Sequence, residues 1–365
     1  MHLKTDQHDL HLRYFKERSK SRNNLIEQKF GQPVVEYIAG FLDMANPGVE
    51  VYSTKEWFNI EMISSDTVEG LVNLKRVNDI AEPNEFFKLV NCKLPRGKYF
   101  IGCFESQKSR HSRLVNKYRQ PFTYPALLFD FTLKRIFPKT RLTRRIYSLL
   151  TRGENRVMSM TETLGRLVSC GFEIVDCRDI GYLTYFVCKK VGMPSYNGTE
   201  NHGLIIKLKR VGQGGRYFDV LKFRTMHPFA EYLQDYVHQK NNICTGGKFN
   251  DDFRITSWGR VLRKLWLDEQ PMWLNLFKGE MKLVGVRPLS EHYFSLYPGE
   301  MQELRVKYKP GLIPPFYVDL PESFEEIVES ERKYLEAYAR SPLLTDFVYF
   351  WKAFYNIFLK KARSA

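Results

Sequence analysis

An adjacent pair of carboxylates, Asp268 and Glu269, lies near the middle of a strongly cationic stretch of this chain. Pro271 follows two residues after the pair and disfavours helical backbone at Gln270, the residue that precedes the proline. The pair is therefore expected at a helix boundary, where free backbone N–H groups favour bound anions. An isolated Asp-Glu pair is usually a solvated helix face, and the density of cations is what sets this pair apart.

The cations flank the pair on both sides: Arg254, Arg260, Arg263 and Lys264 precede it, and Lys278, Lys282 and Arg287 follow it. Cationic side chains bind phosphate oxygens strongly, and a carboxylate held among them can attack phosphorus. Thr256 or Ser257 is expected to cap a helix that runs from about Gly259 to Leu265. Arg260 and Arg263 would share one face of that helix. The stretch therefore predicts chemistry on phosphates.

A glycine turn and a strand are expected upstream of this stretch. Gly212, Gly214 and Gly215 form the turn, which should lead into a strand over residues 217–223. Lys222 and Arg224 lie two residues apart, so on extended backbone they project from the same face. Two cations on one face can hold a diphosphate. The alternative is a solvated strand edge.

Two sequence blocks in this order resemble the bacterial sugar transferases, the monotopic polyprenyl-phosphate phosphoglycosyl transferases. The upstream block consists of Arg210, Val211, Gly212, Gly215, Phe218 and the run Lys222-Phe223-Arg224-Thr225-Met226. The downstream block matches without a gap at Asp252, Arg254, Ile255, Thr256, Gly259, Arg260, Leu262, Arg263, Leu267, Asp268, Glu269, Pro271, Asn275, Gly279, Met281, Leu283, Val284, Gly285, Arg287 and Pro288. The chain departs from the family pattern at Gln270, Met272, Glu280, Val286 and residues 312–318, which bears on the sugar or nucleotide accepted.

The resemblance implies a two-step transfer. Asp268 would attack the β-phosphorus of a nucleotide-diphosphate sugar, with a UDP-sugar as the expected donor, and hold the sugar phosphate as an acyl phosphate. A polyprenyl phosphate, such as undecaprenyl phosphate, would then take the sugar phosphate, initiating surface polysaccharide or glycoconjugate synthesis. Glu269 would coordinate Mg²⁺ or manage a proton. The implied contacts to substrate phosphates are Lys222, Arg224, Arg254, Arg260, Arg263 and Arg287.

Membrane attachment is the second implication of the resemblance. The family carries a re-entrant membrane helix before the upstream block, but residues 192–198 here have the composition of a linker. No run of 18 apolar residues occurs, so no helix is expected to cross a bilayer fully. The chain is therefore expected on the cytoplasmic face of the bacterial inner membrane, as a monotopic or peripheral protein.

Residues 108–152 are the most basic part of the chain. They contain twelve Lys or Arg residues and one acid, Asp130, and so supply most of the net charge of +15. An aromatic-rich apolar run at 122–133 lies inside them, and such a combination favours a segment that enters a membrane interface while its cations meet lipid headgroups. Residues 122–150 are therefore expected to replace the missing anchor. The alternative is a core helix covered by solvated arginines.

A second amphipathic segment occupies residues 343–363. Phe347, Trp351, Phe354 and Phe358 recur at helical spacing and form one aromatic face, followed by Lys360, Lys361 and Arg363. This pattern predicts docking on a membrane surface. Packing against the catalytic core is the alternative.

The first half of the chain alternates strand and helix patterns. Strands are expected at 49–52, 71–74, 99–104, 172–177 and 183–188, and helices at 82–92 and 160–170. This order resembles the second half of a class I methyltransferase-like, Rossmann-type sheet, which ends in a strand pair. No glycine-rich G-x-G-x-G turn follows an early strand, so a degenerate structural domain is expected ahead of a working methyltransferase.

The sequence thus predicts an α/β protein with a methyltransferase-like domain and an α+β phosphoglycosyl transferase domain with interfacial helices. The expected divisions are an arm at 1–30, the first domain at 31–192, a linker at 193–200 and the catalytic domain at 201–365. A catalytically inactive scaffold of a polysaccharide-assembly complex is the alternative function. Nucleic-acid binding would rest on charge alone and is not expected. A homo-oligomer is compatible with the sequence.

Overall fold

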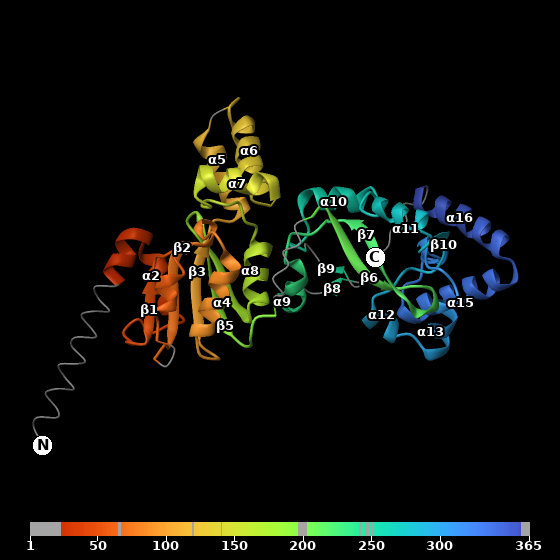
Figure 1. Cartoon of the computed structure of the whole chain (residues 1–365), viewed down its shortest axis with the longest axis horizontal. Coiled ribbons are helices and arrows are strands. Elements are labelled where there is room, and N and C mark those ends of the chain that lie inside the picture. The colour runs from red at the N-terminus through yellow and green to blue at the C-terminus, as the bar shows by residue number, and fades with distance from the viewer. Residues whose placement is uncertain are drawn as a thin grey trace, which may run out of the picture. The chain divides into compact units, whose positions relative to one another are not determined.

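The computed structural model describes residues 23–64, 67–118, 120–139, 141–195, 203–240, 243–244, 248–249 and 252–358. The chain forms two compact units (Figure 1). The first unit comprises Met1–Glu200 together with His227–Tyr236, and the second comprises Asn201–Met226 and Val237–Ala365. The ten residues from His227 therefore belong to the first unit, although the sequence predicts one continuous domain over 201–365.

A five-stranded sheet forms the centre of the first unit, in the order β1-β2-β3-β5-β4. Its strands are β1 (Val49–Tyr52), β2 (Gly70–Arg76), β3 (Tyr99–Phe104), β4 (Phe172–Ile180) and β5 (Leu183–Lys190). The first three strands run parallel, while β5 pairs antiparallel with both β3 and β4. The last two strands form a hairpin that turns at Gly181, whose φ of 62° suits a residue without a side chain.

Helices cover both faces of this sheet because its strands are apolar on both sides. The helices are α2 (Gln32–Ala39), α3 (Phe58–Glu61), η1 (Val77–Asp79), α4 (Pro83–Lys93) and α8 (Met160–Ser169). Val34 and Ile38 of α2 join Ile101 of β3 in one core cluster. The next residue back, Phe100, points to the opposite face and meets Phe87 of α4 with ring centroids 6.2 Å apart.

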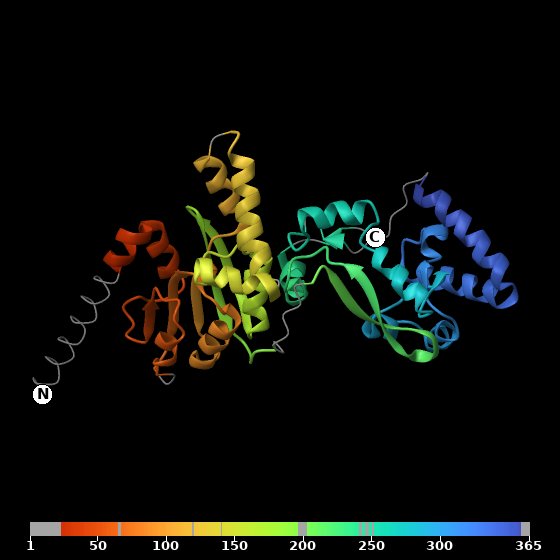
Figure 2. The same cartoon turned by 45° about the horizontal axis from the view of Figure 1, so that its top comes forward.

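A lobe of helices extends beyond one end of the sheet (Figures 1 and 2). It consists of α5 (Gln107–Lys117), α6 (Thr123–Phe131), the π-helical turn η2 (Thr132–Ile136), η3 (Phe137–Lys139) and α7 (Arg141–Thr151). We refer to residues 107–151 as the α5–α7 lobe. It contains the segment whose charge and aromatic content predict an interfacial position.

The segment from His227 to Tyr236 packs on α8 of the first unit. Its 3-10 helix η5 (Ala230–Leu233) follows Phe229, which has a left-handed φ of 64°. The guanidinium of Arg166 lies 4.4 Å from the centre of the Phe229 ring. A Cβ on Gly165 would lie 2.3 Å from the Phe229 carbonyl oxygen, so only glycine permits this close approach. A stretch from the second half of the sequence is thus built into the core of the first unit.

The second unit is assembled from short strand pairs and helices. Its strands are β6 (Ile205–Val211), β7 (Tyr217–Phe223), β8 (Ile243–Cys244), β9 (Lys248–Phe249), β10 (Lys282–Val284) and β11 (Gly311–Ile313). Its helices are η4 (Gln213–Gly215), α10 (Ser257–Lys264), η6 (Gln270–Met272), α11 (Trp273–Phe277), α12 (Glu291–Ser295), α13 (Gly299–Val306), α14 (Phe316–Asp319), α15 (Phe324–Arg340) and α16 (Pro342–Phe358). Helix α9 (Gln234–Lys240) begins in the first unit and continues into the second from Val237. One core cluster joins residues of β10, α13 and α15, among them Val284, Met301 and Tyr334.

The α/β fold class is confirmed, and so are the predicted strands and helices of the first half. The predicted glycine turn leads into β7 as an antiparallel hairpin with β6. The likeness of the first unit to methyltransferases stays a prediction. Most of the predicted arm at 1–30, much of the predicted linker at 193–200 and residues 359–363 lie outside the described residues. Among the residues that the structure describes, no helix combines the length and apolarity needed to cross a membrane.

Candidate functional site

The carboxylates Asp268 and Glu269 lie in the turn between α10 and η6. This confirms that the pair sits at a helix boundary. Helix α10 ends at Lys264, and the chain turns back through Trp266, whose φ of 60° is left-handed. The Leu267 N–H then donates to the Leu262 carbonyl at 2.9 Å, which closes the last turn of the helix. The chain thus changes direction at the end of α10, immediately before Asp268.

The strained backbone at Trp266 is fixed by packing of its side chain. Non-glycine residues in the left-handed region persist only where their surroundings determine them. The Trp266 ring meets Tyr317 of α14 edge-on, with centroids 5.2 Å apart and planes at 74°. Tyr317 is buried, and its carbonyl accepts a hydrogen bond from Asn356 of α16 at 3.0 Å. Two C-terminal helices therefore help to hold the turn that carries the carboxylate pair.

The end of strand β7 is bonded directly to the carboxylate pair. The Phe223 N–H donates to the Asp268 carbonyl at 2.8 Å. The neighbouring Lys222 ammonium lies 2.6 Å from a carboxylate oxygen of Glu269, and both side chains are mostly shielded from water, 17% and 14% exposed. Lys222, predicted as a phosphate contact, thus faces the carboxylate pair and is neutralised by Glu269.

The electrostatic setting of Asp268 raises the pKa of its carboxyl group. Burial raises the pKa of the Asp268 carboxyl above its ordinary value, and the adjacent Glu269 carboxylate raises it further. The charges of Lys222 and Arg263 act in the opposite direction and lower this pKa. An added cation at the pair would relieve the repulsion between the two carboxylates, because opposite charge favours ionisation.

Arg263 is the second predicted cation that the structure places at the carboxylate pair. It projects from α10, and its Nε donates to the Thr225 hydroxyl at 3.0 Å. Thr256 caps α10 by accepting from the Gly259 N–H at 2.9 Å, and its hydroxyl donates to the Thr225 carbonyl at 2.9 Å. A Cβ on Gly259 would lie 2.1 Å from that same carbonyl oxygen. Glycine here lets α10 approach Thr225 closely enough for Arg263 to reach the site.

Arg254, another predicted phosphate contact, is buried in an ion pair with Asp252. It is 4% exposed, and its Nη2 lies 2.7 Å from Oδ2 of Asp252, which is 8% exposed. Burial opposes ionisation of Asp252, but the hydrogen bonds from Arg254 hold its pKa below its ordinary value. The charge of Arg263 lowers this pKa as well. The buried pair fixes the start of the α10 segment.

The remaining predicted phosphate contacts are Arg224, Arg260 and Arg287. Arg224 is partly buried and donates from Nε to the Gly203 carbonyl at 3.0 Å. Arg260 is exposed on α10, one turn from Arg263. Arg287 is also exposed, and its backbone carbonyl accepts from Arg305 at 2.6 Å. The structure thus ties Lys222 and Arg263 electrostatically to Asp268.

Asn275 is a positioning residue that the sequence reasoning treated only as a motif match. It is fully buried on α11, and its amide accepts from the Leu221 N–H at 3.1 Å and donates to the Asp219 carbonyl at 2.7 Å. These bonds fix α11 against β7, the strand that carries Lys222. The signal in the sequence was a polar amide within an otherwise apolar helix, which usually indicates a satisfied buried group.

The carboxylate pair fits the way proteins hold Mg²⁺ near phosphates. Such sites supply one or two carboxylates and leave the other positions to water and substrate phosphates. Across the described parts of the chain, no group of three or more His, Cys, Asp or Glu side chains could hold a metal ion. The pair Asp268–Glu269 could supply one or two carboxylate ligands, so Mg²⁺ at Glu269 stays a prediction that the donor set allows.

Comparison with known proteins finds that this chain is similar to proteins named as sugar transferases. Residues 193–360 match the family model described as bacterial sugar transferase. The galactosyl transferase CpsE of Streptococcus agalactiae is 34% identical over 140 residues, covering 37% of this chain and 31% of that protein. A UDP-galactose-lipid carrier transferase of Erwinia amylovora is 28% identical over 280 residues, covering 72% of this chain and 55% of that protein.

A third relative is the UDP-glucose:undecaprenyl-phosphate glucose-1-phosphate transferase of Caulobacter vibrioides, 34% identical over 110 residues, which cover 30% of this chain and 38% of that protein. The chain therefore spans between about a third and about half of the length of these three relatives. The resemblance drawn from the two sequence blocks is confirmed. Residues 193–360 of this chain are thus similar to the bacterial sugar transferases.

Proposed function

We propose that this chain is a phosphoglycosyl transferase that moves a sugar phosphate from a nucleotide-diphosphate sugar, with a UDP-sugar as the expected donor, to a polyprenyl phosphate. The observation that carries the proposal is the setting of Asp268. Its carboxylate is partly buried, lies next to Glu269 and interacts electrostatically with Lys222 and Arg263. The relatives named as UDP-sugar and undecaprenyl-phosphate transferases support the substrate classes. The reaction would initiate surface polysaccharide synthesis.

In the proposed first step, a carboxylate oxygen of Asp268 forms a bond to the β-phosphorus of the donor. The bond from that phosphorus to the bridging oxygen breaks, and the nucleoside monophosphate leaves with the electron pair. A phosphate oxygen of the polyprenyl phosphate then attacks the same phosphorus. The bond to Asp268 breaks and regenerates the carboxylate. A carboxylate with a raised pKa is more basic, and so more nucleophilic once ionised, than an exposed one.

In this proposal the surrounding residues bind and neutralise charged groups and form no covalent bond to the substrate. Arg263 is positioned to pair with phosphoryl oxygens that lie against Asp268, and its planar guanidinium suits two-pronged binding. Lys222 keeps Glu269 in place through their 2.6 Å contact. We propose Glu269 as the ligand of Mg²⁺, which when bound supplies neutralisation of the phosphoryl oxygens. Arg224, Arg254, Arg260 and Arg287 complete the proposed set, with Arg254 acting through its buried pair with Asp252.

Replacing Arg263 by Gln tests this arrangement. We expect kcat/KM for nucleotide release to fall about a hundredfold, because one donor that stabilises the developing charge is lost. The fall should appear mainly in kcat. Arg340→Gln, at the exposed end of α15, is the matched control and should keep native turnover. Equal activity of both variants would remove Arg263 from the proposed mechanism.

We propose that helix α16 contacts the membrane at which the lipid substrate resides. The aromatic side chains predicted to form its outer face are exposed: Phe347 by 63%, Trp351 by 52% and Phe354 by 43%. The opposite face, with Thr345, Ala353 and Asn356, is buried in the second unit. The helix thus packs on the unit and still offers an apolar face, as an interfacial helix does. The cytoplasmic leaflet is the expected side, since nucleotide sugars are the donors.

We propose that the first unit is a degenerate methyltransferase-like domain. Its parallel strands β1, β2 and β3, followed by a hairpin whose second strand inserts antiparallel beside β3, support this assignment. The missing glycine-rich turn is the reason to call it degenerate. Incubation with labelled adenosylmethionine should show no specific binding.

A panel of UDP-sugars tests the function directly. Purified chain in vesicles that contain undecaprenyl phosphate and Mg²⁺ should release UMP from one member of the panel and form a lipid-linked sugar diphosphate. The same panel identifies the sugar. Absence of UMP release with every donor, from folded protein, would favour the alternative of an inactive scaffold in a polysaccharide-assembly complex.

A further inference from the structure

The outer surface of the α5–α7 lobe carries positive charge without exposed negative charge. Asp130 is the only acid in the sequence from Lys108 to Arg152. It is 8% exposed and paired, with its carboxylate 2.7 Å from Nε of Arg110 and 3.2 Å from Nζ of Lys134. Lys108, Lys117, Arg145 and Arg152 are exposed. A partner that contacts this surface therefore meets exposed lysine and arginine side chains and no exposed carboxylate from residues 108–152.

The same lobe exposes large apolar side chains on α6, on α7 and just ahead of α6. They are Phe122 (70%), Tyr124 (70%), Leu128 (69%), Phe129 (67%), Ile146 (46%), Leu149 (84%) and Leu150 (67%). On α7, Ile146, Leu149 and Leu150 share one helical face by their spacing. Tyr147 points the other way, is fully buried and donates its hydroxyl hydrogen to the Glu154 carbonyl. Tyr147 therefore anchors α7 on its buried side, and the apolar face of α7 points outward.

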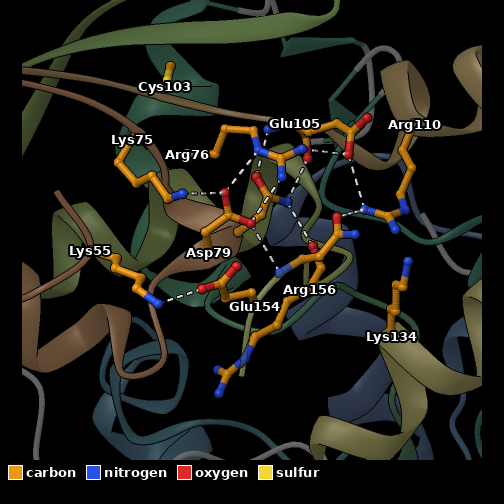
Figure 3. Close-up of polar contacts among 12 residues, drawn as sticks. Lys55, Lys75, Arg76, Asp79, Cys103, Glu105, Arg110, Lys134, Glu154 and Arg156 are labelled. Carbon is orange, nitrogen blue, oxygen red and sulfur yellow. Dashed lines mark hydrogen bonds and ion pairs between the residues drawn. The ribbon is translucent and has the colours of Figure 1, made fainter. Parts of the chain in front are cut away.

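Buried ion pairs fix the lobe to the ends of the sheet strands. Glu105, immediately after β3, is 2% exposed and accepts from Arg110 at 3.0 Å and from Arg113 at 2.6 Å. Figure 3 shows Arg76, at the end of β2, between this carboxylate and Asp79, at 3.5 and 3.0 Å. Removing one member of a buried pair leaves an uncompensated charge, so these contacts stabilise the attachment of the lobe to the sheet.

A second attachment joins the middle of the lobe to helix α8. Arg135 donates to Glu162 at 2.5 Å and to the Val157 carbonyl at 2.8 Å. Both charged side chains are buried. The lobe is therefore held by polar contacts at its base, while its apolar residues stay outside. A chain that merely needed to hide these side chains could have packed them on the sheet.

We propose that the α5–α7 lobe docks on an anionic lipid membrane, with the apolar side chains of α6 and α7 entering the interface and the cations meeting lipid headgroups. Exposed aromatic and aliphatic side chains rimmed by lysine and arginine are the two attractions that hold amphipathic helices on such surfaces. The first unit would then add its own membrane contact to that of α16.

Charge argues for lipid over a second copy of the chain. A contact between two such lobes would bring only like charges together, which is unfavourable. Aliphatic side chains argue against nucleic acid, because bases stack on aromatic rings or guanidinium planes and gain nothing from Leu128, Leu149 or Leu150. An anionic bilayer satisfies both the cations and the aliphatic groups.

The test measures partition of the full chain into phosphatidylcholine vesicles with and without phosphatidylglycerol. Leu149→Gln/Leu150→Gln should lower the partition coefficient by at least about tenfold, because the burial of two leucine side chains is lost. Arg145→Glu should reduce the preference for phosphatidylglycerol by about fivefold or more. The matched control is Phe58→Gln/Met62→Gln, two exposed apolar residues at α3 beside the acidic Glu56 and Glu61. This control should partition as the native chain does.

Circular dichroism and the melting temperature check that each variant is folded. If the double α7 variant fails to fold, Leu128→Gln with Arg145→Glu carries the test. Equal partition of native and lobe variants would overturn the proposal, and so would equal affinity for neutral and anionic vesicles. Loss of self-association or of DNA binding in the lobe variants, with unchanged vesicle partition, would also overturn it. The test measures no turnover, so its outcome does not depend on whether the proposed transferase activity is correct.

Discussion

Asp268→Asn should abolish sugar-phosphate transfer, with UMP release falling by about four orders of magnitude or more. Loss of a covalent nucleophile typically has effects of this size, since the amide cannot form the acyl phosphate. The substitution changes one atom and removes a charge that is partly buried beside Glu269. Folding should therefore survive. The measurement is UMP release in the vesicle assay, followed by a search for a phosphosugar-modified peptide containing residue 268.

Glu303→Gln is the matched control for this experiment. Glu303 is an exposed carboxylate on α13 of the same unit, so its replacement should leave turnover unchanged. The native chain, stopped early in the reaction without polyprenyl phosphate, should carry the sugar phosphate on Asp268. Full turnover by the Asp268→Asn variant would exclude the nucleophilic role.

Arg305→Met should destabilise the second unit by about 3–5 kcal/mol, the usual cost of breaking a buried ion pair. Arg305 and Glu331 form a hydrogen-bonded pair and are 6% and 4% exposed. Arg305 also donates to the Arg287 carbonyl at 2.6 Å, so the segment that carries a proposed phosphate contact loses support too. Urea unfolding followed by tryptophan fluorescence reports the change, because four of the five tryptophans lie in the second unit.

The pH dependence of this variant provides an independent check. Burial already raises the pKa of Glu331, and the charge of Arg305 opposes that rise. Without Arg305 the pKa should rise further, so the folded state binds a proton that the unfolded state releases above about pH 4.3. Stability then falls as the pH rises through this window, and acidification from neutral pH should restore part of it. The double variant Arg305→Met/Glu331→Leu should recover most of the stability and lose the pH effect.

Local chemistry explains which parts of the site could be predicted from the sequence. Pro271 and its neighbours place the carboxylate pair at the end of a helix, and the structure agrees. Thr256 was one of two expected caps and is the cap that forms. The apolar runs at 71–74 and 99–104 predicted strands, and the structure shows β2 and β3 there, mostly buried because helices cover both faces of the sheet. These features depend on residues close together in the chain.

Contacts across long sequence separations could not be predicted in the same way. Lys222 and Glu269 are 47 residues apart, and nothing local indicates that the ammonium would be neutralised by that carboxylate. The same holds for Tyr37, whose hydroxyl donates to Asp176, 139 residues away. Arg254 is a different case, since its partner Asp252 is two residues away. The two opposite charges are neighbours in the sequence, and the structure shows them as a buried ion pair.

The insertion of His227–Tyr236 into the first unit has a consequence for the design of fragments of this protein. A fragment starting at residue 201 would carry Phe229, Ala230 and Leu233, which are buried in the intact chain, without the α8 surface that covers them. Such a fragment would expose these apolar side chains to solvent and tend to aggregate. Moving residues 201–365 onto another protein would therefore require the first unit as well, or a redesigned segment in place of residues 227–236.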